Sequence, residues 1–220
     1  MTLPLLFLSG AGLPAWVWDD VRRRLPVDSR VADRPRGRAG LAQCAEAARA
    51  TAADWPAYGV VAHSIGAVVA ATLVSQDPDG VRAVVAVCGI VPRPNASFVA
   101  SLPVPQRWVM GAVIRVVGTR PPDSMIRSGL CHGLDDATAD RVVADFTPEA
   151  RRLYLDPAPP CRWPTEVSYV ATTRDPEFPL DLQQRYAAEL GATPTTLDTG
   201  HLPMLADPAA LAALIVPRTT

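Results

Sequence analysis

Apolar runs of strand length alternate with helix-like segments along most of this 220-residue chain. The strand-like runs cover residues 4–9, 29–33, 58–63, 81–89, 166–172 and 193–199. The helix-like segments lie near 15–25, 40–54, 65–76, 180–190 and 208–215. Parallel strands need a crossover between them, usually a helix, so the alternation predicts an α/β fold in which a mostly parallel sheet carries helices on both faces. The length fits one domain spanning residues 1–220.

The alternation is interrupted between residues 92 and 164. This insertion holds 11 of the 23 prolines and has the pattern of short helices joined by proline-rich stretches. Apolar segments such as "QRWVMGAVIRVVG" argue against disorder. A long insertion between two strands is commonly functional, so we predict a helical lid packed over the edge of the sheet. The alternative is a peripheral helical subdomain without contact to any site.

Composition excludes several classes of function. The formal net charge of −1 does not favour a nucleic-acid partner or an anionic membrane surface. All 21 basic residues are arginines, so no lysine is present to act as a nucleophile or form a Schiff base. The four cysteines form no C-x-x-C pair and have no metal-like spacing with the three histidines. We therefore expect neither a metal nor an organic cofactor.

The first residues, "MTLPLLFLSGAG", predict a strand that begins almost at Met1. The stretch lacks a basic n-region, and its apolar run is too short for a signal peptide or a membrane span. The cysteines are interpreted as reduced thiols, with Cys88 buried in an apolar strand. These features predict a cytoplasmic protein without a membrane partner, and they leave its oligomeric state open.

A serine stands at a sharp corner in "VVAHSIGAVVA", residues 60–70, where an apolar strand passes into a helix of small residues. Ala62 and Gly66 lie two positions to either side and let strand and helix approach closely, as a nucleophile elbow requires. Such a turn exposes the Ser64 hydroxyl and aims the backbone N–H of Ile65 at a developing oxyanion. Ala62 replaces the first glycine of G-x-S-x-G, and a helix-capping serine in an ordinary turn is the alternative.

A nucleophilic serine needs a base, and the chain offers three histidines. His201, in "LDTGHLPMLADP", directly follows the last strand, where parallel-sheet proteins build their sites. His63 adjoins Ser64, but neighbouring strand residues point to opposite faces, so we interpret it as a packing residue. His132 lies in the insertion and is interpreted as a loop or surface residue. His201 is therefore the predicted base.

The base in turn needs a carboxylate to orient it. Asp175, in "YVATTRDPEFP", follows the next-to-last strand and is the favoured candidate. A turn aspartate before Pro176 is its alternative interpretation. Asp198 competes for the role, although it is only three residues before His201 on the same strand end, and Glu177 is also near.

The chain order Ser64, Asp175, His201, each just past a predicted strand, resembles the α/β-hydrolase fold family. This resemblance implies a catalytic triad in which Ser64 is the nucleophile, His201 the general base and Asp175 the residue that orients it.

The N-terminal "FLSGAGLPAWVWDDV" resembles the oxyanion loop of small α/β-hydrolases, with Ser9-Gly10 where His-Gly usually stands. That resemblance implies that the N–H of Ala11 joins the N–H of Ile65 in the oxyanion hole. A glycine-rich turn without a catalytic role is the alternative. A dinucleotide loop does not fit, because G-x-G-x-x-G is incomplete.

Residues 3–90 and 166–215 also resemble the plant methylesterase and hydroxynitrile lyase branch and its bacterial relatives. The shared features are the Trp-x-Trp of "GAGLPAWVWDDV", the Gln after the acid loop and the "H-x-P-M-L…P" ending of "TGHLPMLADP". The chain has no lysine for the substrate-binding role that some lyases of this branch give one, so the resemblance implies an esterase more than a lyase.

Together these features predict a carboxylesterase-like serine hydrolase that cleaves an ester or activated acyl bond of a small to medium hydrophobic substrate. Candidate pocket walls are Trp16, Trp18, Trp108 and Met110, with core packing as the alternative for each. Two other functions remain open. One is a non-hydrolytic enzyme of the same fold, such as a cyclase, lyase or acyl transferase of a biosynthetic pathway, and the other is a non-catalytic binding protein.

Overall fold

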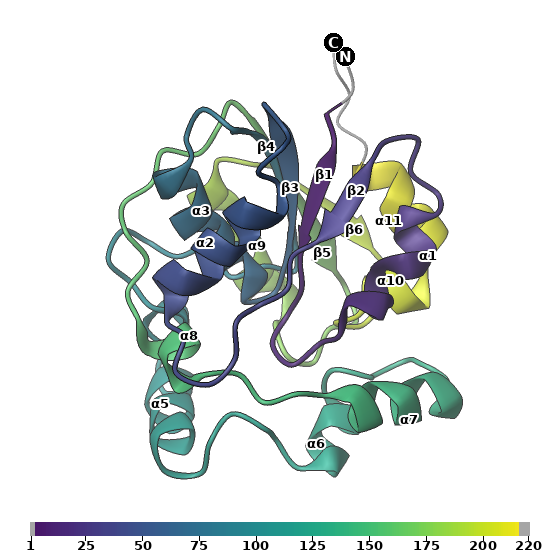
Figure 1. Cartoon of the computed structure of the whole chain (residues 1–220). Helices are drawn as coiled ribbons and strands as arrows, with labels where there is room; N and C mark the ends of the chain where they lie inside the picture. Colours follow the sequence, from purple (N-terminus) through teal and green to yellow (C-terminus); the bar gives the residue numbers. More distant parts are fainter. Residues whose placement is uncertain (1–2, 216–220) are drawn as a thin grey trace.

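Six parallel strands form one sheet in the order β2-β1-β3-β4-β5-β6 (Figure 1). The computed structural model describes residues 3–215, so the first two and last five residues of the predicted domain lie outside the described part. The strands are β1 (Leu5–Leu8), β2 (Ser29–Val31), β3 (Tyr58–His63), β4 (Val81–Val87), β5 (Glu166–Thr172) and β6 (Pro194–Leu197). The predicted parallel sheet is confirmed. Strands β3 and β5 have the predicted bounds, and the other four strands are shorter than predicted by at most two residues at either end.

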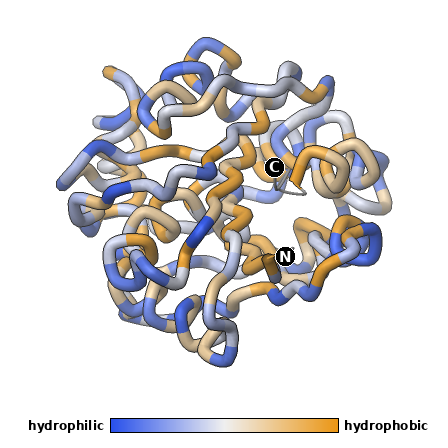
Figure 2. The backbone as a smooth tube through the Cα atoms, turned by 90° about the horizontal axis from the view of Figure 1, so that it is seen from above, coloured by the Kyte–Doolittle hydropathy of each residue, from blue (hydrophilic) through white to orange (hydrophobic). Residues whose placement is uncertain are grey.

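Helices cover both faces of this sheet, as predicted (Figure 1). One face carries α2 (Leu41–Thr51), α3 (Gly66–Gln76) and α9 (Leu180–Leu190). The other carries the 3₁₀ turn η1 (Ala15–Trp18), α1 (Asp19–Arg22), α10 (Pro203–Ala206) and α11 (Pro208–Ile215). The hydrophobic stretches lie in the centre of the molecule and the hydrophilic ones mainly around it (Figure 2).

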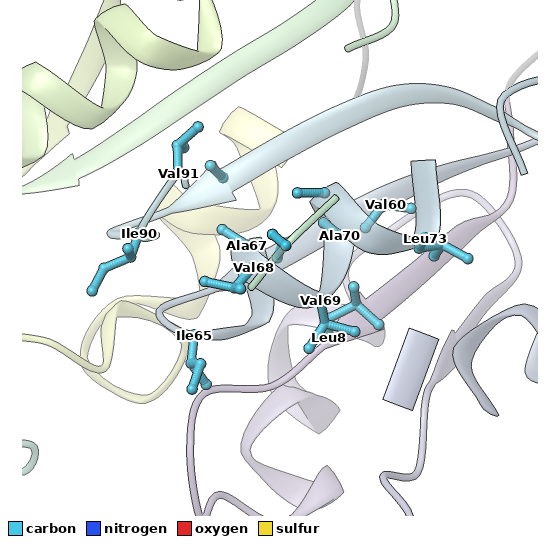
Figure 3. Close-up of a cluster of buried hydrophobic side chains, with 14 of the residues drawn as sticks. Leu8, Val60, Ile65, Ala67, Val68, Val69, Ala70, Leu73, Ile90 and Val91 are labelled. Atoms are coloured by element: carbon cyan, nitrogen blue, oxygen red, sulfur yellow. The ribbon is translucent and has the colours of Figure 1, made fainter. Parts of the chain in front are cut away.

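The side chains of the strands contribute to two separate hydrophobic cores, one on each face of the sheet, because they alternate in direction along each strand. Leu6 and Leu8 of β1 pack under α2 and α3, whereas Leu5 and Phe7 pack under α1 and α11. Helix α3 is apolar around most of its circumference and is buried from Gly66 to Val74. Figure 3 shows its alanines, valines and Leu73 packed with Leu8 and with Val60 of β3. The central strands therefore hold the first turn of α3 rigidly at the end of β3.

The insertion between β4 and β5 contains five short helices. These are α4 (Phe98–Ser101), α5 (Gln106–Val116), α6 (Asp123–Ser128), α7 (Asp136–Asp145) and α8 (Arg151–Leu155). Helices α5, α6 and α7 lie beyond the carboxyl ends of the strands (Figure 1). Helix α5 buries Gly111 and Ile114 and exposes much of its remaining apolar surface, including Val109, Val113 and Val116. The insertion thus lies on the side of the sheet where a site at the strand ends would open.

Within residues 3–215, no helix combines the length and the apolar character that crossing a bilayer requires.

Candidate active site

Ser64 occupies a strained turn between β3 and α3. Its φ is 55°, a value that residues with a side chain rarely adopt and that costs on the order of 1–3 kcal/mol. Its N–H donates to the Val87 carbonyl at 3.1 Å, and its own carbonyl accepts the N–H of Ile90 at 3.1 Å. These bonds tie the turn to the end of β4, and strain retained in this way is typical of a functional site.

Gly66 allows this turn to approach the neighbouring strand. A Cβ at this position would lie 2.4 Å from the carbonyl oxygen of Leu8, which is backbone at the end of β1. Only glycine therefore lets the N-terminus of α3 lie against the loop that follows β1.

Gly66→Ala is expected to lower the free energy of unfolding by about 1–3 kcal/mol, because backbone must move to accept the methyl group. An alanine in a helix normally stabilises by about 1 kcal/mol relative to glycine, so a loss would be diagnostic. Urea denaturation would measure it. Gly111→Ala in α5 is the matched control, because the closest atom to its Cβ is on the flexible Arg115 side chain, and it should be neutral or stabilising. Equal stability of Gly66→Ala and wild type would contradict the close approach.

His201 and Asp175 form a buried pair beside this turn. The ring Nδ1 of His201 lies 2.7 Å from Oδ2 of Asp175, and both side chains are almost completely buried. The Asp175 carboxylate also accepts the backbone N–H groups of Glu177 and Phe178, at 2.8 and 3.1 Å, and the Thr172 hydroxyl at 3.1 Å. These donors fix the carboxylate, which in turn fixes the orientation of the imidazole.

Asp198, the competing carboxylate, lies elsewhere. It is exposed, accepts the Thr173 hydroxyl at 2.8 Å and forms an ion pair with Arg174. The geometry thus places Asp175, not Asp198, against His201. His132 is exposed, in line with its interpretation as a surface residue, and its carbonyl lies so close to Gly200 that a Cβ there would be 2.3 Å from it.

Gln183 of α9 supports the acid loop, a role that the sequence did not reveal. Its Oε1 accepts the Thr172 N–H at 2.9 Å, and its Nε2 donates to the carbonyls of Thr172 and Phe178 at 2.9 and 2.6 Å. The side chain is fully buried. A glutamine on the apolar face of a predicted helix was the available signal, since buried polar groups need partners.

The electrostatics of the pair favour charge on both members. Burial disfavours the imidazolium, but Cys88 and Asp175, through charge and hydrogen bonding, raise the pKa of His201 well above its usual value. Burial raises the pKa of the Cys88 thiol, so Asp175 is the partner that is charged at neutral pH. Burial also disfavours the carboxylate of Asp175, yet His201 and the backbone N–H groups lower its pKa. The pair can therefore stabilise the imidazolium that forms when His201 accepts a proton.

His63 does more than pack. Burial, assisted by the charge of His201, lowers the pKa of His63 to about 3, so its ring is neutral at ordinary pH. Its Nε2–H donates to the carbonyl of His201 at 2.8 Å, and the two ring centroids are 4.8 Å apart. Because His63 directly precedes Ser64, this bond holds the backbone of His201 close to the serine turn. Within residues 3–215 no hydrogen bond joins Ser64 to His201, and such bonds often tighten only when substrate binds.

His63, Cys88 and His201 are the residues of the described chain whose donor atoms could meet at a metal ion, all within 4.8 Å of one another. One possible ligand atom of each residue already has a protein partner, whereas Nδ1 of His63 has none. His63 Nε2 and Cys88 Sγ both bond the His201 carbonyl, and His201 Nδ1 bonds Asp175. The cluster thus serves to place His201.

The loop after β1 lies beside the Ser64 turn. A Cβ on Gly10 would be 2.5 Å from Nδ1 of His63, so this glycine too permits a close approach. Among the hydrogen bonds of residues 3–215, none uses the backbone N–H of Ala11 or of Ile65. Both N–H groups are therefore unused donors, and unused N–H donors are what an oxyanion hole requires.

The four predicted pocket walls are not brought together. Trp18 is fully buried, 4.8 Å from the Phe7 ring, and its indole N–H donates to the Ser9 hydroxyl at 3.0 Å. Trp16 is half-buried and donates to Asp145 of α7 at 2.8 Å. Trp108 and Met110 lie on α5, where Trp108 is 64% exposed and Met110 is 38% exposed. Their contact with substrate stays a prediction.

Comparison with known proteins agrees with this architecture. The sequence profile of the alpha/beta hydrolase family matches residues 5–214. No curated protein shows significant sequence similarity to the chain.

Among solved structures, an extracellular alpha/beta-hydrolase from a Paenibacillus species superposes with a TM-score of 0.82 at 18% identity, covering 98% of this chain and 99% of that one. Polyneuridine aldehyde esterase gives 0.77 at 14% identity, with 97% and 98% covered. Tomato methylketone synthase I gives 0.74 at 12% identity, with 97% and 96% covered. The family match over nearly the whole sequence, on a sheet with this strand order, shows that the chain belongs to the alpha/beta hydrolase family.

Proposed function

We propose that this chain is a carboxylesterase-like serine hydrolase with the triad Ser64, His201 and Asp175. The observation that carries the proposal is the strained serine turn beside a buried histidine–aspartate pair. A serine in the left-handed region costs free energy, and such strain is typical of a functional site. The presence of the turn and the pair at the carboxyl ends of three parallel strands of one sheet, β3, β5 and β6, favours catalysis.

In this mechanism the Ser64 hydroxyl attacks the substrate carbonyl while His201 Nε2 accepts its proton. Asp175 holds Nδ1 and stabilises the imidazolium. The N–H groups of Ala11 and Ile65 bind the oxyanion, and loss of one such donor costs about 2.7–4 kcal/mol in comparable sites. His201 then protonates the leaving group. Water, activated by the same histidine, hydrolyses the acyl-enzyme and regenerates Ser64.

The substrate is proposed to be a small to medium hydrophobic ester or acyl compound. Helix α5 supports this class because it offers exposed valines together with Trp108 and Met110 on the side where the strands end (Figure 1). One of the similar structures is an esterase by name.

Fluorophosphonate labelling combined with p-nitrophenyl esters of two to eight acyl carbons tests the proposal. We expect one label per chain and measurable ester turnover. No labelling of the folded protein would overturn the serine nucleophile.

A non-hydrolytic reaction on the same triad is the second candidate, favoured by the similarity to a protein named a synthase. Specific labelling of Ser64 without turnover of any ester in the series would favour it over hydrolysis.

We also propose a cytoplasmic location. Cys44, Cys88, Cys131 and Cys161 are free thiols, a state that reducing compartments maintain.

A further inference from the structure

We propose that Arg34 and Glu149 form a clamp that sets the direction of the Ala11 N–H and makes the oxyanion hole depend on the seating of the insertion. This inference rests on the proposed function. Arg34 follows β2, and Glu149 lies between α7 and α8 of the insertion. The two positions are 115 residues apart in the chain, and their side chains meet at 2.6 Å.

Arg34 binds the loop after β1 through two consecutive carbonyls. Its Nη1 donates to the Ser9 carbonyl at 2.6 Å, and its Nη2 donates to the Gly10 carbonyl at 2.5 Å and to Glu149 Oε1. The planar guanidinium satisfies these acceptors with donors in a fixed geometry, which a lysine ammonium could not reproduce.

The Gly10 carbonyl belongs to the same peptide unit as the Ala11 N–H. In a trans peptide the C=O and N–H bonds point in opposite directions, and the unit is planar. Because Arg34 holds the Gly10 carbonyl toward itself, the Ala11 N–H is directed away from Arg34. Within the described residues this N–H has no acceptor. Arg34 therefore fixes a free donor without touching substrate, which makes it a positioning residue.

Glu149 ties this loop to the insertion. Its Oε1 also accepts the Gly12 N–H at 3.0 Å, and two residues earlier the N–H of Thr147 donates to the Gly12 carbonyl at 3.0 Å. Gly12 has a φ of +72°, and a Cβ there would lie 2.2 Å from the Phe146 ring. Segment 146–149 thus contacts the loop through both the N–H and the carbonyl of Gly12. If this segment moved away from the loop, Arg34 would also lose its ion pair with Glu149.

Burial indicates that the pair is not an incidental surface contact. Each side chain is only 11% exposed. In every other arginine–carboxylate pair of the described chain, both side chains are more exposed than this. Buried ion pairs are often no more stabilising than apolar residues of similar volume, so a role in orientation accounts for this one better than stability does. A cavity of about 310 Å³ borders both residues, the loop and Asp145.

The test compares Arg34→Lys, Glu149→Gln and the double variant Arg34→Met/Glu149→Leu with wild type. Arg34→Lys keeps the charge opposite Glu149, and the double variant leaves no buried charge unpaired. We expect kcat for p-nitrophenyl esters to fall at least about 10-fold in each, with KM changed by less than about 3-fold, since only transition-state binding is weakened. Affinity for an alkyl boronic acid, which forms a tetrahedral adduct, should fall in parallel.

Hydrogen exchange supplies a readout that does not need activity. Backbone amides of residues 10–13 should exchange faster in Glu149→Gln than in wild type, as expected if the insertion holds the loop. Arg30→Gln is the control, because Arg30 lies in β2 and pairs with the exposed Asp54, and it should match wild type in every assay.

Wild-type kcat, boronate affinity and loop exchange in Arg34→Lys and Glu149→Gln would overturn the clamp. An inert wild type that neither labels nor turns over would instead overturn the proposed function, and the exchange experiment would still decide whether the insertion holds the loop.

Discussion

Replacing Ser64 with alanine is expected to lower kcat for ester hydrolysis by about 10⁵- to 10⁶-fold, with little change in KM. The hydroxyl is the atom that forms the acyl-enzyme, and no other serine occupies a strained turn next to the His201–Asp175 pair in residues 3–215. Steady-state kinetics and fluorophosphonate labelling would measure the loss. Ser124→Ala, at an exposed serine of α6, is the control and should label as wild type does.

The backbone of Ser64 adds a second readout to this experiment. A φ of 55° suits glycine, so Ser64→Gly should be as inactive as Ser64→Ala but more stable by about 1 kcal/mol. Thermal unfolding of the two variants compares them directly. Labelling of Ser64→Ala at the wild-type level would remove Ser64 from the mechanism.

Asp175→Asn is expected to reduce kcat by about 10⁴-fold, the scale of loss when a triad aspartate becomes an amide and the imidazole takes the wrong tautomer. Asp198→Asn should change kcat by less than about 3-fold, because Asp198 is exposed and bonds Thr173 and Arg174. The two substitutions are chemically identical and lie at neighbouring strand ends, so each serves as control for the other. A larger loss in Asp198→Asn would transfer the orienting role to that residue.

Asp175→Asn is also expected to shift the pH dependence of kcat/KM. His201 must be neutral to accept the Ser64 proton, so the rate falls as the pH drops below the pKa of His201. Asp175 stabilises the imidazolium and raises that pKa, and its loss should therefore move the acid limb of the profile to lower pH. A pH–rate profile of the residual activity, set against wild type, checks the direction. An acid limb that moves to higher pH would contradict the electrostatic role.

Much of the fold could be predicted from the sequence because it follows from local patterns. Apolar runs such as residues 58–63 are buried on both sides in the structure, and both layers of helices they require are present. The elbow was visible because Gly66, a small residue next to a strand end, is needed where α3 meets the end of β1.

The supporting residues were less visible. The alternation rule placed His63 away from the chemistry, yet it did not show that the Nε2–H of His63 holds the carbonyl of His201. The sequence showed a glutamine after the acid loop but not what it binds, and the three bonds of Gln183 to that loop join segments eleven and five positions away. Hydrogen bonds of this kind depend on side-chain direction, which residue spacing does not give.

The sequence by itself determined the parallel α/β sheet, the helices on both faces and the insertion at 92–164. It also determined the strand ends that carry Ser64, Asp175 and His201. These features follow from strand length, apolar alternation and turn chemistry, which are properties of neighbouring residues. Only the tertiary structure decided which carboxylate meets His201 and that Arg34 meets Glu149. Those contacts join segments far apart in the chain, and their partners are fixed by how the sheet and the insertion pack, which one-dimensional patterns do not record.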